Sequence, residues 1–358
     1  MNSRACCEMK ILFIASDIQA LGGIQQYNRK FLDAFRLRGS VRLVELKHKG
    51  VFPKARFISK SIFQGLIYNP DITVCAHINY ATLGFFMRVF FGRKYIVCTH
   101  GVDVWEIESW LKRKAMLAAT LITTVAEYTR DKIVNQLPEA RDRIYLLYNP
   151  VDGSRFAPRK KSAGLVGKYG LENKKAILTV ARLSAEEGYK GYDRVIKAMP
   201  QILKTVPNAV YFLIGDGDDA PRVRRLISEI SLGNKVIMAG AYPNEKLPEY
   251  YNLADVFVMP SKAEGAPAVF VEALSCGIPV IAGNQDGSAT PLQNGEVGLL
   301  IDPDSIEEIA RAIIKVLTGR APKNLLDRDF LRRKTLEKFG LDRFPERVNE
   351  MLSLFLAK

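Results

Sequence analysis

Two glutamates that stand eight residues apart, Glu264 and Glu272, belong to the stretch 261–282, S-K-A-E-G-A-P-A-V-F-V-E-A-L-S-C-G-I-P-V-I-A. Pro267 suits the first turn of a helix that Gly277 would end. Within such an apolar helix the carboxylate of Glu272 needs a ligand, a cation or solvent, because carboxylates are almost never fully buried without a partner. The positive amino terminus of the helix favours a phosphate at the loop that holds Glu264.

Two cations stand at the ends of predicted elements. Arg182 follows the apolar run 176–181, and Lys190 precedes the helical stretch 192–203. Cations at a strand end and at a helix start are placed to neutralise a diphosphate, and an arginine adds bidentate geometry. Either residue alone is better explained as a solvated surface cation. Only in combination with Glu264 and Glu272 do they indicate a site for a diphosphate.

The elements that must position these residues alternate between apolar runs and helical stretches, which is typical of doubly wound parallel sheets. His100 follows the strand 95–99 at its carboxyl end, where ligands bind in open α/β sheets. Gly22 and Gly23 precede the helix 24–38, in a loop that matches neither common nucleotide-binding pattern. The strands are expected at 10–15, 41–46, 72–76, 95–99, 121–124 and 144–147, and in a second series at 176–181, 209–214, 236–238, 256–259 and 278–281.

The Glu-x7-Glu arrangement, followed by a small residue, Cys276-Gly277 and a Pro-Val-Ile strand, resembles the family 4 retaining glycosyltransferases of GT-B fold. The resemblance implies an α/β protein with two doubly wound Rossmann-like domains facing a central cleft. Residues 1–160 would form the acceptor-binding domain and residues 161–340 the domain that binds the nucleotide sugar. Residues 341–358 would form a terminal helix that packs back on the first domain.

The resemblance also implies roles for single residues. In the family the first glutamate binds the transferred sugar and the second binds the ribose, which gives these roles to Glu264 and Glu272. The family's arginine and lysine stabilise the leaving diphosphate, as Arg182 and Lys190 would here. His100 stands in a His-Gly-x-Asp string that corresponds to a contact with the transferred sugar. The expected catalytic residues are therefore Glu264, His100, Arg182 and Lys190.

Further donor contacts are expected in two loops. The family places the two glycines near residue 22 beside the diphosphate, where the backbone can approach closely. Pro267 stands where many members have glycine, and it has no N–H to donate, so its neighbours must supply the contacts. The loop 183–189 is slightly longer than the family pattern, which leaves the reach of Lys190 open. The expected donor-binding residues are Gly22, Gly23, Arg182, Lys190, Glu264, Gly265, Ala266, Ala268, Val269 and Glu272. His77 matches a weaker family feature and is equally well explained as a hydrogen-bonded strand end.

No metal and no other cofactor is assigned. Asp216-Gly-Asp218 and Asp302-Pro-Asp304 have the D-x-D spacing of metal-dependent sugar transferases, but short acidic turns are common. Asp304 and Ser305 are better explained as the cap of a helix at 306–317. The cysteines show no paired metal spacing and indicate a reducing compartment. Because residues 1–10 lack the apolar core of a secretory signal, a cytoplasmic protein is expected. The five cysteines are Cys6, Cys7, Cys75, Cys98 and Cys276.

The net charge of +14 is distributed unevenly. Residues 1–160 hold 25 Lys and Arg against 13 Asp and Glu, a balance of +12, and residues 161–358 hold 27 against 25. A basic half favours an anionic membrane surface or a nucleic acid as partner, although solubility alone would also explain it. No nucleic-acid module is recognisable, so a nucleic-acid partner is not expected. Trp110 beside Lys112–Lys114 suits a membrane interface about as well as it suits a solvated edge.

The resemblance as a whole implies a retaining enzyme that moves a hexose from a nucleotide diphosphate sugar. We expect a UDP-sugar rather than a GDP-sugar, and a saccharide or lipid-linked saccharide acceptor in cell-surface polysaccharide synthesis. The enzyme would be peripheral on the cytoplasmic face of the membrane. Two alternatives stay open, namely a catalytically silent GT-B binding protein and a sugar synthase or phosphorylase on the same fold.

Overall fold

The computed structural model describes residues 9–20, 22–48 and 50–358, and it divides into two units. The first unit consists of the described residues through Pro150 together with Asp342–Lys358, and the second is Val151–Leu341. The division lies earlier than residue 160, the limit expected from the sequence. Val151 forms a parallel bridge with Gly340 within the second unit.

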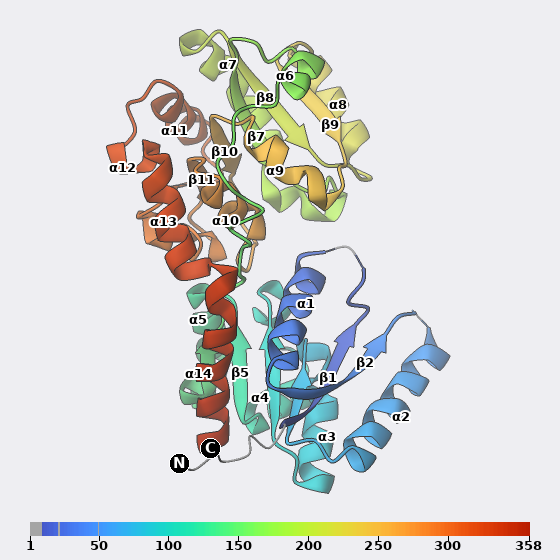
Figure 1. The fold of residues 1–358 in the computed structure, drawn as a ribbon. Coiled ribbons are helices and arrows are strands. Elements are labelled where there is room, and N and C mark those ends of the chain that lie inside the picture. The colour runs from blue at the N-terminus through green and yellow to red at the C-terminus, as the bar shows by residue number, and fades with distance from the viewer. Residues whose placement is uncertain (1–8, 21, 49) are drawn as a thin grey trace, which may run out of the picture. The chain divides into compact units, whose positions relative to one another are not determined.

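The first unit contains a parallel sheet with the strand order β2-β1-β3-β4-β5-β6 (Figure 1). The alternation of strands and helices predicted for this half is confirmed. Its strands are β1 (Met9–Ser16), β2 (Gly39–Leu46), β3 (Ile72–Cys75), β4 (Tyr95–Thr99), β5 (Leu121–Thr124) and β6 (Ile144–Leu146). Its helices are α1 (Gly23–Arg36), α2 (Val51–Ile67), α3 (Ala81–Phe91), α4 (Trp110–Ala118), α5 (Glu127–Gln136) and α14 (Phe344–Ala357).

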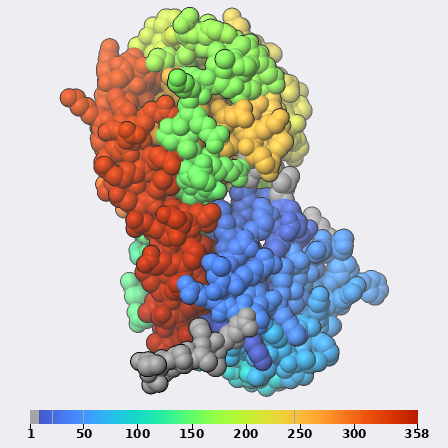
Figure 2. All heavy atoms as spheres, viewed as in Figure 1, coloured from blue at the N-terminus to red at the C-terminus, as the bar shows by residue number. Residues whose placement is uncertain are grey.

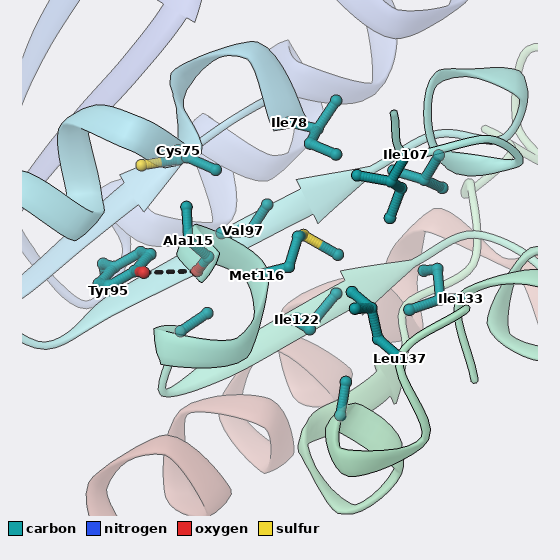
Figure 3. Close-up of a cluster of buried hydrophobic side chains, with 14 residues drawn as sticks. Cys75, Ile78, Tyr95, Val97, Ile107, Ala115, Met116, Ile122, Ile133 and Leu137 are labelled. Atoms are coloured by element: carbon teal, nitrogen blue, oxygen red, sulfur yellow. Dashed lines mark hydrogen bonds between the residues drawn. The ribbon is translucent and has the colours of Figure 1, made fainter. Parts of the chain in front are cut away.

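Strand β1 is apolar and buried from Ile11 to Ala15, as expected for a strand whose sheet is covered by helices on both faces. Leu12 and Ile14 belong to a buried cluster with residues of α2 and α3. Phe13 points to the other face, where its ring lies 6.1 Å from that of Phe31 on α1. Helix α3 also contributes to a second buried cluster, which is shown in Figure 3. In this cluster the Tyr95 hydroxyl donates a hydrogen bond to the carbonyl of Ala115 on α4.

The second unit contains a parallel sheet with the order β12-β11-β10-β7-β8-β9. The sequence-based series ended at 278–281, and the structure corrects it in two ways. Strand β11 begins only at Val280, because Gly277 and Ile278 close the preceding helix. A further strand, β12, has only three residues, too few for a periodic signal. The strands are β7 (Lys175–Val180), β8 (Ala209–Ile214), β9 (Val236–Gly240), β10 (Val256–Met259), β11 (Val280–Gly283) and β12 (Leu299–Ile301).

Helices surround this second sheet as the sequence predicted. They are α6 (Ala163–Tyr169), α7 (Tyr192–Thr205), α8 (Ala220–Glu229), α9 (Leu247–Tyr251), α10 (Ala268–Ser275), α11 (Ile306–Leu317), α12 (Lys323–Leu326) and α13 (Arg328–Phe339). Ser305 caps α11 through a hydrogen bond from the backbone N–H of Glu308. Within the described ranges, none of the helices combines the length and the apolar character needed to span a membrane. Cys75, Cys98 and Cys276 are buried free thiols, whereas Cys6, Cys7 and most of the segment 1–10 lie outside the described residues.

Helix α14 packs against α1 within the first unit, and Figure 2 shows the end of the chain in red beside the blue of this unit. The buried ring of Phe344 lies 6.1 Å from the ring of Tyr27 and 6.2 Å from that of Phe31. The Tyr145 hydroxyl donates to the carbonyl of Arg347 at 3.2 Å. The last helix therefore completes the core of a unit that the rest of the chain leaves at Pro150.

This packing predicts the effect of removing the Phe344 ring. Phe344→Ala should lower the free energy of unfolding of the first unit by about 3–5 kcal/mol, because the lost ring leaves a cavity against α1. The chain has two tryptophans, Trp105 and Trp110, and both lie in the first unit, so the tryptophan fluorescence in a urea titration reports this unit. Leu354→Ala, an exposed position on the same helix, is the control and should change little. Equal effects of the two substitutions would contradict this account.

Candidate functional site

An ion pair connects two loops of the second unit. The Lys190 Nζ lies 2.7 Å from Glu264 Oε1 and 3.6 Å from Glu187 Oε2. Only 16% of the Lys190 side chain and 18% of the Glu264 side chain are exposed. Arg182 also pairs with Glu187, but 71% of the Arg182 side chain is exposed. The structure thus brings Arg182, Lys190 and Glu264 together through Glu187, a residue that the sequence had not singled out.

The backbone around Lys190 explains how the longer loop still reaches Glu264. The loop tightens into a 3-10 helix, Ala185–Lys190, and Gly191 then takes φ +77° to begin α7. A Cβ atom on Gly191 would lie 2.5 Å from the carbonyl oxygen of Pro260, so only glycine fits this approach. Arg194 on α7 donates to the carbonyls of Tyr189 and Pro260 at 3.0 and 3.1 Å. These contacts hold the Lys190 loop against the end of β10.

The acidic turn Asp216-Gly-Asp218 supports the loop of Arg182. The backbone N–H of Leu183 donates to the carbonyl of Asp216 at 3.0 Å. The N–H of Ala185 donates to Asp218 Oδ1, also at 3.0 Å. The D-x-D spacing therefore has a structural explanation at this turn.

The other acidic turn has a similar explanation. Asp304 forms ion pairs with Lys262 at 2.9 Å and with Arg194 at 3.0 Å. These two cations hold the pKa of the Asp304 carboxyl below its ordinary value.

The buried carboxylate of Asp286 positions Glu264, and sequence reasoning missed it. It accepts hydrogen bonds from the Ser261 hydroxyl at 2.7 Å, from the Glu264 N–H at 2.8 Å and from the Ser288 N–H at 2.9 Å. Burial raises the pKa of Asp286, and the bonds from the two serines oppose that rise. A Cβ atom on Gly287 would lie 1.7 Å from the Gly265 carbonyl oxygen. The only feature of the sequence that could have indicated Asp286 is the Asp-Gly-Ser turn that follows β11, the strand that pairs with β10.

Glu272 lies in α10, and it has a protein partner. The Tyr251 hydroxyl donates to Glu272 Oε2 at 2.7 Å. Burial raises the pKa of Tyr251 well above its ordinary value, and the neighbouring carboxylate adds to the rise. The sequence argument had left the partner of this carboxylate to a ligand, a cation or solvent, and Tyr251 supplies one contact from within the fold.

The other donor-loop candidates surround the start of α10. Pro267 is the N-cap residue of this helix, so Ala268 and Val269 are its first two residues. The N–H groups of a first helical turn have no intrahelical acceptor and can serve an anion. Gly265 and Ala266 complete the turn that leads from Glu264 to the helix.

The remaining candidates belong to the first unit. The Nε2 of His100 donates to the carbonyl of Ala76 at 2.9 Å. The backbone N–H of His100 donates to Asp103 Oδ1 at 3.0 Å. The His100 ring lies 5.4 Å from the ring of Tyr27 on α1, the helix for which Gly22 is the N-cap residue and Gly23 the first residue. These three candidates thus share the carboxyl end of β4 and the beginning of α1.

His77 caps a short helix within the first unit. Its Nδ1 accepts a hydrogen bond from the N–H of Asn79 at 3.1 Å and so caps the 3-10 helix Ile78–Tyr80. Burial lowers the pKa of His77, although Asp103 opposes this shift. A neutral ring is consistent with Nδ1 acting as an acceptor.

Residues 166–329 match the model of the family described as Glycosyl transferases group 1. Over 246 residues the chain is 29% identical to the "GDP-mannose-dependent alpha-(1-6)-phosphatidylinositol monomannoside mannosyltransferase" of Mycolicibacterium smegmatis, a match that covers 65% of this chain and 63% of that protein. The match thus spans less than two thirds of the length of this relative.

Two solved structures cover almost all of the chain. HepE of Anabaena in complex with UDP aligns with a TM-score of 0.78 at 19% identity, over 96% of this chain and 100% of that chain. Sucrose-phosphate synthase of Thermosynechococcus elongatus aligns with a TM-score of 0.81 at 20% identity, over 98% of this chain and 100% of that chain. At these identities the two likenesses show a shared fold.

The hydrogen bonds of Asp286 predict the result of an acid-to-amide change. Asp286→Asn must turn an NH2 group toward one of the three donors, which leaves a buried donor unpaired and costs about 1–3 kcal/mol. Amide hydrogen exchange in peptides covering 261–266 or 286–290 should therefore become about tenfold faster. Glu229→Gln on the exposed face of α8 is the matched control and should exchange like the wild type. Unchanged exchange in Asp286→Asn would show that this carboxylate does not hold the loop.

Proposed function

We propose that this chain, which has the GT-B fold and matches the model of glycosyl transferases group 1 over residues 166–329, transfers a hexose from a nucleotide diphosphate sugar to an acceptor hydroxyl. The observation that carries the proposal is the ion pair between Lys190 and Glu264, which unites the cation and the carboxylate loops inside the matched segment 166–329. We propose further that the anomeric configuration is retained.

Arg182 and Lys190 would act on the diphosphate. Glu187 contacts both cations and keeps their positive charges close together. Cations held in advance beside a leaving group stabilise the negative charge that develops in the transition state. Because Arg182 is largely exposed, its exchange of Glu187 for a phosphate requires little rearrangement.

Glu264 would orient the migrating sugar and Glu272 the ribose. The backbone of Glu264 is bound on both sides, since its N–H donates to Asp286 and its carbonyl accepts from Gly287 at 2.8 Å. A group fixed in this way can hold sugar hydroxyls without reorganisation during the reaction. Glu272 is oriented by Tyr251, which donates to its Oε2, and carboxylate oxygens are suitable acceptors for ribose hydroxyls. His100 is proposed as a further contact to the transferred sugar.

The nucleotide base and the acceptor belong to the same proposal. The name of the mycobacterial relative specifies GDP-mannose, whereas the HepE structure contains UDP. The preference for UDP expected from the sequence stays a prediction, so both donors belong in the assay. The relative's name also specifies a phosphatidylinositol mannoside. This lipid and the basic first half support a lipid-linked saccharide acceptor and an enzyme peripheral on the cytoplasmic face.

One prediction of the proposed function concerns the diphosphate. Arg182→Ala and Lys190→Ala should each lower kcat/KM by about 30-fold, since each loses charge-assisted hydrogen bonds worth about 2 kcal/mol. The measurement is the rate of sugar release from UDP-glucose and GDP-mannose, with product analysis to separate transfer from synthase or phosphorylase chemistry. Arg224→Ala, an exposed cation on α8, is the control. Wild-type rates in Arg182→Ala would refute its role.

The second prediction separates the two glutamates. Glu264→Ala should mainly lower kcat, because contacts to the migrating sugar matter most in the transition state. Glu272→Ala should mainly weaken the binding of free UDP or GDP, measured by calorimetry. If the free nucleotide binds Glu272→Ala as tightly as the wild type, Glu272 does not bind the ribose.

A further inference from the structure

Exposed large apolar side chains are concentrated on two helices of the first unit. Among the described residues there are thirteen such side chains; all of them lie in the first unit, and eight lie on α2 and α3. We call these eight the α2–α3 surface: Val51, Phe52, Ile58, Phe63, Leu66, Ile67, Val89 and Phe90. A concentration of exposed large apolar side chains is a common feature of interaction sites. The two helices contact each other, and α2 lies at the outer right-hand edge of the unit in Figure 1.

The periodicity of α2 shows that core packing does not require these side chains. The inward face consists of Phe57, Ser61 and Gly65, which are buried and spaced four residues apart. At 3.6 residues per turn, Phe52 and Phe63 lie on the opposite side of the helix. Phe52 is 88% exposed. A helix that only covers a sheet has polar residues on this side, so α2 is apolar on two faces.

The segment of the chain that holds α2 and α3 is mostly basic. Residues 46–102 contain eight Lys and Arg and a single acid, Asp71. That acid is already used, since its carboxylate accepts a hydrogen bond from the N–H of Lys10 at 2.8 Å. Lys54, Arg56 and Lys60 are exposed on α2 among the apolar side chains. The surface thus combines large apolar groups with an excess of positive charge.

The three cations near Trp110, at positions 112–114, are less available to a membrane than the sequence indicated. The Lys112 Nζ donates to Asn79 Oδ1 at 2.7 Å, and Arg113 donates to the Gln136 carbonyl at 2.6 Å. Lys114 lies over the Trp110 ring, with its Nζ 5.0 Å from the centroid. Two of the three cations are therefore engaged within the fold.

We propose that the α2–α3 surface docks on an anionic lipid bilayer, with Phe52, Phe63 and Phe90 in the interfacial region and the cations of α2 against lipid phosphates. Aromatic and aliphatic side chains between lysines and arginines suit this interface, because long cationic side chains reach the headgroups while their neighbours enter the acyl boundary. A second copy of the chain is disfavoured, since a two-fold contact would bring two positively charged surfaces together. The docking itself does not depend on the proposed function. Only its purpose, which is to bring the enzyme to a lipid-linked acceptor, rests on that function.

The test is flotation of the full chain with vesicles of phosphatidylglycerol and phosphatidylcholine, and with phosphatidylcholine alone, across a salt series. We expect binding to the anionic vesicles that weakens as salt rises. Lys54→Glu/Arg56→Glu/Lys60→Glu should weaken the partition by at least about fivefold for each cation. Phe52→Ser/Phe63→Ser/Phe90→Ser should weaken it by about tenfold or more.

Matched controls locate the effect on the α2–α3 surface. Leu354→Ser/Leu356→Ser alters exposed apolar side chains of α14, and Arg224→Glu/Arg225→Glu alters exposed cations of the second unit. Both should bind vesicles like the wild type, and all variants should keep the wild-type circular dichroism and rate of donor hydrolysis. If the wild type binds vesicles but does not hydrolyse the donor, the proposed function is wrong and the docking proposal stands. Absent binding at low salt, binding unchanged in both α2–α3 variants, or loss only in Trp110→Ser would overturn the docking proposal.

Discussion

The ion pair between Lys190 and Glu264 is the interaction on which the second unit's candidate site depends. Both side chains are more than four-fifths buried, so neither charge has enough water to be stable alone. A pair of this kind contributes little net stability, because desolvation offsets much of the attraction. On the proposed function, its role is to keep two charges at fixed positions in a place of low dielectric. The glycine at 191 and the carboxylate at 286 fix those positions from either side.

The charges around this pair do not balance, and the imbalance constrains how an anionic donor would enter. Glu187, Glu264 and Asp286 supply three carboxylates beside the two cations Arg182 and Lys190. An incoming diphosphate must therefore displace a carboxylate from a cation rather than meet a free positive surface. Arg182 is the cation that can change partners, since its side chain is exposed and that of Lys190 is not. Binding order and affinity would follow from this exchange, with Lys190 remaining as the fixed charge.

Sequence patterns predicted the strands well and the supporting contacts poorly, for a physical reason. A parallel strand covered on both faces is an apolar run that can be recognised locally, as β1 and β8 show. The partners of the candidate residues are tertiary: Tyr251 reaches Glu272 across 21 positions and Ser261 reaches Asp286 across 25. No periodicity marks such pairs. The reach of Lys190 was open for the same reason, because loop length does not reveal the 3-10 turn that shortens the path.

The two units differ in where their exposed apolar side chains and their cations lie. The proposed donor chemistry needs charges that are paired, partly buried and rigid, and among the described residues of the second unit no large apolar side chain is highly exposed. The first unit leaves Phe52 and Phe90 exposed, and their burial against the proposed partner would be favourable. The surrounding excess of lysine and arginine keeps such a surface soluble until it meets that partner. Because the apolar and cationic groups occupy the same helices, a single contact with an anionic apolar surface would satisfy both.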